Sequence, residues 1–189
     1  MMWRRASAPV HLALLAPAAA LAAPAMAFAV EYLTSEQAEA ALFPEAQSFE
    51  VKQFTLDEAA RQALQARLGL PVRGRWALRL ARRGEQVVGA VVVDDVIGKF
   101  DRITFAAGVG ADGALRQVEI LAYRESHGGE VRLEKWRAQF VGKTSASALR
   151  VGDDIANISG ATLSCQHVTD GVRRIVAVVG TLWRSGAPR

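Results

Sequence analysis

The spacing of hydrophobic positions changes twice along the chain. After residue 30, apolar side chains recur at intervals of three and four in two short segments, which is the period of an amphipathic helix. The first segment follows Thr34-Ser-Glu-Gln37 and ends near Pro44, and the second follows Thr55-Leu-Asp-Glu58 and ends at Gly69 and Pro71. Both openings have the form of a capping box, which satisfies free backbone N–H groups at the start of a helix. We therefore predict two N-terminal helices.

The middle of the chain has a different pattern, in which apolar residues alternate with polar ones or form β-branched runs, as strands require. The predicted strands are Trp76 to Leu80, Val87 to Val93, Ile103 to Phe105, and Leu115 to Tyr123. Turn signals at Arg83-Gly84 and Ala111-Asp112-Gly113 separate neighbouring strands. Consecutive strands joined by short turns favour an antiparallel sheet or meander over a parallel sheet with crossovers.

The helical period returns near the end of the chain. A stripe of apolar residues extends from Val168 to Trp183 and is typical of a helix packed on a core. The pattern as a whole predicts an α+β fold, with a single domain built on a central, mainly antiparallel sheet. Two N-terminal helices and a C-terminal helix, which follows the sequence Ser-Gly-Ala-Thr, complete this predicted fold.

The first 29 residues are typical of a secretory signal peptide. Arg4 and Arg5 precede an uncharged apolar stretch at residues 12–25, and residues 25–29 contain two small-x-small cleavage sites. A retained membrane anchor would need an uninterrupted apolar run of about 20 residues, and two prolines interrupt this one. We expect residues 1–29 to be removed, the protein to be periplasmic, and the mature chain to have no membrane-spanning segment.

Charge and cysteine content narrow the function classes. The chain has 23 Lys and Arg against 19 Asp and Glu, and the predicted signal peptide contains basic residues but no acidic ones. So small an excess, without a basic stripe interleaved with aromatic residues, argues against nucleic acid as a partner. With one cysteine, Cys165, no intramolecular disulfide can support the exported domain. We interpret Cys165 as a small buried filler, with a reactive thiol as the alternative.

The segment from Ser159 to Ser164 precedes or opens the last predicted helix. The first backbone N–H groups of a helix have no internal partner and carry partial positive charge, so they attract a phosphate group. Gly160 and Ala161 add little bulk, which leaves the hydroxyl of Thr162 accessible to a modifying enzyme. The alternative is that Ser159 or Thr162 only caps the helix, as these residue types often do.

Several segments occur in an order and spacing that resemble a known family. They are Val96-Ile-Gly-Lys99, Asp112-Gly113, Tyr123-Arg-Glu-Ser-His-Gly-Gly-Glu130, Trp136-Arg-Ala-Gln-Phe140 with Gly142-Lys143, and Ser159-Gly-Ala-Thr-Leu-Ser164. Together they resemble the FMN-binding domain family, which includes the covalent flavin subunits of Rnf-type complexes and of the sodium-pumping NADH:quinone oxidoreductase. The resemblance extends from about Val87 to Val179. We place an N-terminal helical segment at residues 30–70 and the FMN-binding domain at residues 71–184.

The resemblance implies that a flavin transferase moves FMN from FAD onto Thr162 as a phosphoester. It implies cofactor contacts from a set of residues in two clusters, and it assigns no catalytic residue and no metal ligand. The cofactor-binding set is Thr162, Ser159, Gly160, Ala161, Leu163, Ser164, His127, Gly128, Gly129, Glu130 and Trp136. Backbone amides at Gly128 and Gly129 would reach the flavin ring and stabilise its reduced form.

The resemblance implies an electron-transfer flavoprotein, a carrier or redox subunit rather than a stand-alone enzyme. Its expected partners are the flavin transferase and membrane-bound or soluble redox proteins, and any association with the inner membrane would run through a partner. The alternative function is a module without covalent flavin, acting in partner binding or in assembly of a membrane redox complex.

Three features of the sequence leave residue roles open. Trp136 and Phe140 are spaced as neighbours on a helix, so Trp136 is either a core residue or a platform for the ring. Lys99 can pair with a carboxylate or with a flavin oxygen. Related motifs usually carry an Asp six positions before the threonine, where this chain has Ala156, and either acid of Asp153-Asp154 could take its place.

Overall fold

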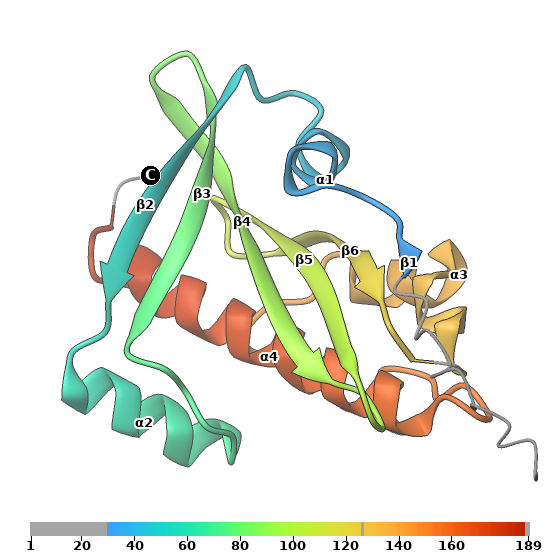
Figure 1. Ribbon diagram of the computed structural model, residues 1–189. Coiled ribbons are helices and arrows are strands. Elements are labelled where there is room, and N and C mark those ends of the chain that lie inside the picture. The colour runs from blue at the N-terminus through green and yellow to red at the C-terminus, as the bar shows by residue number, and fades with distance from the viewer. Residues whose placement is uncertain (1–29, 126, 188–189) are drawn as a thin grey trace, which may run out of the picture.

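The predicted strands form the centre of a six-stranded antiparallel sheet in the computed structural model, which describes residues 30–125 and 127–187 (Figure 1). The strands are β1 (Val30–Glu31), β2 (Ser48–Thr55), β3 (Arg75–Arg83), β4 (Gln86–Ile97), β5 (Arg102–Gly110) and β6 (Leu115–Tyr123). Their spatial order is β1-β6-β5-β4-β3-β2. The predicted meander is therefore confirmed, and the fold is α+β with a single domain.

Both edge strands were absent from the sequence prediction. The short β1 pairs Val30 with Tyr123 of β6, and β2 pairs with β3 along its whole length. The side chains of β2 alternate between half-buried and exposed, and Val51 is 57% exposed. Because β2 is an edge strand whose apolar residues are spaced irregularly, its period of two is weak. Residues 30–70 thus contribute strands as well as helices.

The predicted helices are present, with one difference at a cap. They are α1 (Ser35–Leu42), α2 (Glu58–Leu68), α3 (Glu134–Arg137) and α4 (Thr162–Arg184), with 3₁₀ turns at Gly129–Arg132 and Ala138–Phe140. The capping box of α1 is formed by Thr34 and Gln37 as predicted. In α2 the N-cap is Asp57, whose carboxylate accepts a hydrogen bond from the Ala60 N–H at 2.7 Å, because Thr55 belongs to β2.

The two faces of the sheet are covered by different helices (Figure 1). α4 crosses one face and buries its apolar stripe against β4 and β5, while α1 lies on the opposite face over β5 and β6. The predicted stripe of α4 is buried throughout, and burial of each Val or Ile side chain contributes about 1.5–3 kcal/mol. Cys165 is fully buried in this layer, in agreement with a filler role.

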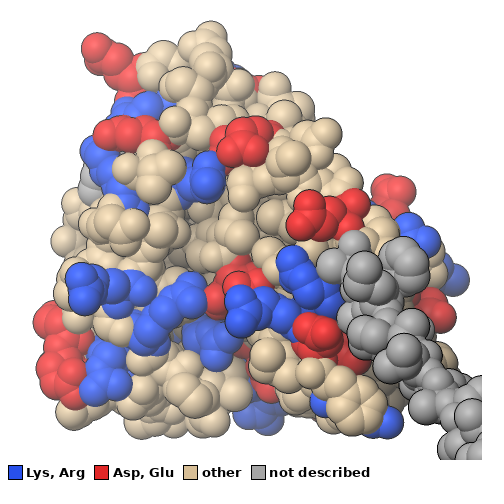
Figure 2. Space-filling view, in the orientation of Figure 1, with Lys and Arg blue, Asp and Glu red and all other residues tan. Residues whose placement is uncertain are grey.

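Charged side chains of both signs are mixed on the surface. Figure 2 shows Lys and Arg side chains across the lower half of one face, with Asp and Glu side chains among them. Ion pairs join Arg73 to Asp94 at 2.8 Å and Arg82 to Glu50 at 2.9 Å. Within residues 30–125 and 127–187, no helix combines the length and the apolar character needed to cross a membrane. The predicted signal peptide lies outside the described residues.

Candidate functional site

Thr162 is the first residue of α4, and its hydroxyl is exposed at the mouth of the helix. Ala161 occupies the N-cap position, and no side chain caps this end of the helix. The first bond along α4 runs from Cys165 N to Ala161 O at 2.9 Å, so the preceding N–H groups have no partner within the helix. The capping role considered for Ser159 or Thr162 is therefore wrong, and the free N–H groups are available to an anion.

A tight turn presents this helix start. The N–H of Ala161 donates to Ile158 O at 3.0 Å, and Gly160 between them has a φ of +84°. A positive φ at the third position of such a turn requires glycine or a similar residue. The side chain of Asn157 folds back over the turn, and its Nδ2 donates to Thr162 Oγ1 at 3.1 Å. The hydroxyl of Thr162 is thus oriented before any ligand binds.

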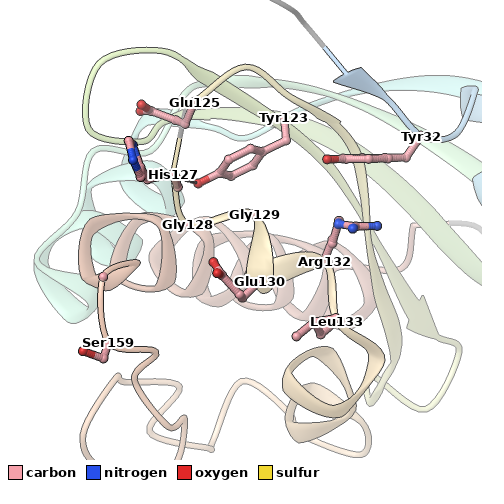
Figure 3. Close-up of a pocket in the computed structure, with 11 residues that line it drawn as sticks. Tyr32, Tyr123, Glu125, His127, Gly128, Gly129, Glu130, Arg132, Leu133 and Ser159 are labelled. Atoms are coloured by element: carbon pink, nitrogen blue, oxygen red, sulfur yellow. Dashed lines mark hydrogen bonds between the residues drawn. The ribbon is translucent and has the colours of Figure 1, made fainter.

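Two adjoining pockets open at this end of the molecule. One has a volume of about 490 Å³ and is lined by Tyr32, Tyr123, Glu125, His127, Gly128, Gly129, Glu130, Arg132, Leu133, Ser159 and Gly160 (Figure 3). The other has a volume of about 380 Å³ and is lined by Lys99, Phe100, Glu125, His127, Gly160, Ala161, Thr162, Leu163 and Ser164. We call them the tyrosine pocket and the threonine pocket. Both are of the size of small-molecule sites, and they share residues from two loops.

A hydrogen-bonded chain fixes the loop between these pockets to α4. The hydroxyl of Tyr123 donates to His127 O at 2.5 Å, and Ser164 Oγ lies 3.0 Å from the same hydroxyl. Because the carbonyl oxygen takes the proton of Tyr123, Ser164 is the donor in the second bond. Burial raises the pKa of Tyr123 above its ordinary value, so the phenol stays protonated and can donate at neutral pH.

Gly128 fits this arrangement because it has no side chain. Its φ is +87°, and a Cβ at this position would lie 2.7 Å from the Tyr123 hydroxyl and 3.1 Å from the Cβ of Ala161. The loop therefore packs its backbone directly against β6 and the start of α4. The close approach brings the predicted clusters, residues 127–130 and residues 159–164, to the same site.

The turn between β4 and β5 closes the threonine pocket from the other side. Glu125 Oε1 accepts the N–H groups of Phe100 at 2.6 Å and Asp101 at 2.9 Å, which holds the turn that carries Lys99. The ammonium of Lys99 lies 4.8 Å from the ring centre of Phe100 and lines the pocket, with no carboxylate partner among the described ion pairs. Lys99 thus adds a positive charge to the pocket that contains the helix start.

The tyrosine pocket has an aromatic wall of its own. Figure 3 shows Tyr32 and Tyr123 on one side, with Glu130 and Arg132 across from them. The guanidinium of Arg132 lies 5.1 Å from the ring centre of Tyr32, within the range of a cation–π contact. Tyr32, Phe100, Tyr123 and Arg132 were not predicted as site residues. They lie on four separate segments, and no local motif connects them.

Trp136 is the predicted site residue that the structure places apart from both pockets. It is 4% exposed, packs edge-to-face with Phe140 at 5.1 Å between ring centres, and donates from Nε1 to Ala156 O at 2.8 Å. These contacts match the core role and not the ring platform. The indole instead anchors the segment that leads into the turn before α4.

The acids upstream of the turn do not reach Thr162. Asp154 accepts hydrogen bonds from Lys143 Nζ and from the N–H of Arg150, each at 2.9 Å, and Asp153 is exposed. Neither carboxylate takes the place of the Asp expected at position 156. The polar group that contacts the hydroxyl of Thr162 is the amide of Asn157.

Comparison with protein families identifies one domain, and its range contains the two clusters at residues 127–130 and 159–164 that line the pockets. Residues 98–177 match the FMN-binding domain. The range includes Lys99, the loop at residues 127–130 and the start of α4. No curated protein matches the chain.

Proposed function

We propose that the protein is an exported flavoprotein that carries FMN as a phosphoester on Thr162, and the match of residues 98–177 to the FMN-binding domain supports this proposal. The observation that carries the proposal is the uncapped start of α4. It combines an exposed hydroxyl, free backbone N–H groups and the nearby Lys99 in one pocket. These groups suit a phosphodiester, which keeps one negative charge at the attachment point.

The residues present fit the shape and charge of FMN. The threonine pocket has the donors for the phosphate, and the tyrosine pocket has flat side chains and free backbone for the ring. The two pockets adjoin each other, because both are lined by Glu125, His127 and Gly160. A ligand with a charged end and an apolar aromatic end would therefore span both.

In the attachment step, the Oγ of Thr162 would form a bond to the FMN phosphorus of FAD. The bond from that phosphorus to the AMP half breaks, AMP leaves, and the threonine hydroxyl loses its proton. A flavin transferase would supply the catalysis, because no general base among the described contacts accepts a hydrogen bond from this hydroxyl. Asn157 donates to the oxygen and so orients it without removing its proton.

Bound FMN would supply reversible electron transfer. The chain would hold the cofactor at a protein surface, since both pockets are lined by the exposed His127, and the threonine pocket also by the exposed Thr162 and Leu163 of α4. Backbone N–H groups near Gly128 and Gly129 would favour negative charge on a ring beside them. The electrons would pass between membrane-bound or soluble redox proteins after export directed by residues 1–29.

The experiment is to express the chain with a flavin transferase in a host that exports it, and to measure its intact mass. We expect a gain of one FMN less water, and fluorescence of the band after denaturing electrophoresis. Thr162→Ala should abolish both, whereas Ser159→Ala, which removes an exposed hydroxyl from the same turn, should keep both. An unshifted mass beside a modified positive control would refute the covalent proposal.

One observation favours a second function, a module that binds FMN or a partner without a covalent bond. Thr162 receives a hydrogen bond from Asn157, and position 156 has no carboxylate. Titration of free FMN into unmodified protein separates the possibilities. If FMN fluorescence is quenched and Lys99→Gln weakens the quenching, FMN binds noncovalently at the threonine pocket. If no quenching occurs, partner binding is the remaining function.

A further inference from the structure

A third pocket lies away from the flavin site, where the C-terminal end of α2, the segment at residues 145–150 and the middle of α4 meet. It has a volume of about 280 Å³ and is lined by Arg67, Leu68, Ser145, Ser147, Ala148, Leu149, Arg150, Arg173 and Ala177. We call it the arginine pocket. Arg173 follows Thr162 by eleven positions on the same helix, which corresponds to about 16 Å along the helix axis.

The charges in the arginine pocket are unbalanced. Its lining contains Arg67, Arg150 and Arg173 but no Asp or Glu. Among the ion pairs of the described residues, Arg67 and Arg150 have no carboxylate partner. Two of the three arginines therefore bring positive charge to one small cavity without a counter-charge, and an anion between them would offset their repulsion.

Arg173 is the least exposed of the three arginines, and one of its N–H donors has no partner among the described residues. Its Nη2 donates to Leu68 O at 3.0 Å and lies 3.3 Å from Asp170 Oδ1, which fixes the side chain at 13% exposure. Its Nε is buried and has no hydrogen-bond partner within the described residues. The unpaired Nε lies beneath the surface, so Arg173 contributes its positive charge to the wall of the pocket, while Arg67 and Arg150 have the exposed donors that a ligand oxygen can reach.

The segment that carries Arg150 is held in a strained conformation. Leu149 is fully buried and has a φ of +46°, a left-handed conformation that a branched side chain rarely adopts. Asp154 holds the segment from behind by accepting the N–H of Arg150 and pairing with Lys143. The Arg150 carbonyl also accepts N–H groups from residues 153–155. This network fixes the wall of the pocket in advance of binding.

We propose that the arginine pocket binds the phosphoryl group of a small molecule. A phosphate carries close to two negative charges and presents several acceptor oxygens, which match the forked donors of arginine and the hydroxyls of Ser145 and Ser147. The volume exceeds that of a phosphate ion, so the pocket also admits a short phosphate ester. The site is independent of the flavin site, and the binding does not require Thr162 to be modified.

The test is calorimetric titration of the purified whole chain with inorganic phosphate and, separately, with glycerol 3-phosphate, at constant ionic strength. We expect saturable binding that Arg67→Gln and Arg150→Gln each weaken by about tenfold, the loss of one charge-assisted hydrogen bond. Both arginines are exposed, so these variants should fold. Arg83→Gln removes the same charge from the exposed end of β3 and should bind as the unmodified chain does.

The two ligands identify the source of the phosphoryl group. Tighter binding of glycerol 3-phosphate would identify a phosphate ester as the ligand class, and equal or tighter binding of phosphate would identify the free ion. Binding that persists in both arginine variants would place the anion outside the arginine pocket and overturn the proposal. Absence of saturable binding, or an equal loss in Arg83→Gln, would also overturn it.

Discussion

Asn157 donates a hydrogen bond from Nδ2 to the hydroxyl oxygen of Thr162 at 3.1 Å, across the turn that starts α4. In the proposed flavin attachment the Thr162 hydroxyl oxygen is the nucleophile. The hydrogen bond from the amide occupies one of the lone pairs of this oxygen. A carboxylate at the same place would accept the hydroxyl proton instead, which increases the electron density on the oxygen. We therefore expect residue 157 to influence the reactivity of Thr162 in the proposed attachment.

Asn157→Asp should accelerate flavin attachment to Thr162 by about tenfold, since a charge-assisted hydrogen bond of this kind is worth about 1.5–3 kcal/mol. The measurement is the flavinylated fraction against time, from intact mass with a limiting amount of transferase. Asn157→Ala removes the donor without adding an acceptor and is the control for the loss of the amide. Equal rates for the aspartate and alanine variants would contradict the prediction.

Gly128→Ala should destabilise the fold and disrupt both pockets. The new Cβ would lie 2.7 Å from the Tyr123 hydroxyl, in a residue with a φ of +87°. Gly142→Ala is a matched control, because Gly142 has a φ of +77° and open space around its Cα. Backbone strain should cost both variants about 1–2 kcal/mol, and the overlap should cost Gly128→Ala about 1–3 kcal/mol more. Urea unfolding of both variants measures the difference. Equal losses of stability would show that the loop moves to accommodate the new Cβ without cost.

The central sheet and α4 could be predicted because their side chains face a core and so carry a strong period. The stripe from Val168 to Trp183 reports burial on one face of the helix, and the near-continuous apolar runs in β5 and β6 report burial on both faces of the sheet. β2 gave no such signal because neither of its faces is fully covered. Its existence depends on backbone pairing with β3, which leaves little trace in the pattern of side chains.

The candidate site was predictable only where a local motif forms it. The turn that contains Gly160 and the loop that contains Gly128 carry their backbone requirements in the sequence, because each needs a glycine with a positive φ. The contributions of Tyr123 and Tyr32 arise from the pairing of β1 with β6, which no short segment encodes. The helical spacing of Trp136 was consistent with two roles, and its buried bond to Ala156 O favours the core role.

Tyr123→Phe should lower the free energy of unfolding by about 1–3 kcal/mol. The substitution removes the hydroxyl that bonds to both His127 O and Ser164 Oγ, and these groups are shielded from water. Ser164→Ala removes the other end of the same chain. The double variant should lose less than the sum of the single losses, since each single change leaves a partner unsatisfied. Urea unfolding of the three variants gives the coupling energy, and strict additivity would show that the two hydroxyls act separately.

Acid should destabilise the fold in part by protonating the carboxylate of Asp154, which holds the segment at residues 143–154. Although burial by itself raises the pKa of Asp154, the hydrogen bonds from Arg150 N–H and Lys143 outweigh it and hold the pKa below its ordinary value of 3.8. A lowered pKa in the folded state stabilises the fold fully above the unfolded pKa, and this contribution is lost as the pH falls through the folded pKa. The unmodified chain should therefore lose more stability between pH 6 and pH 3 than Asp154→Asn does.

The measurement is the urea midpoint at both pH values, with Asp153→Asn as the control. Asp153 is exposed on the same segment, and its replacement removes the same charge without breaking the bonds to Arg150 and Lys143. The Asp153 variant should retain the acid sensitivity of the unmodified chain. If Asp154→Asn also retained it, the stabilisation by these hydrogen bonds would be independent of the ionisation of Asp154, and the rigidity inferred for the arginine pocket would have to come from the Arg150 carbonyl alone.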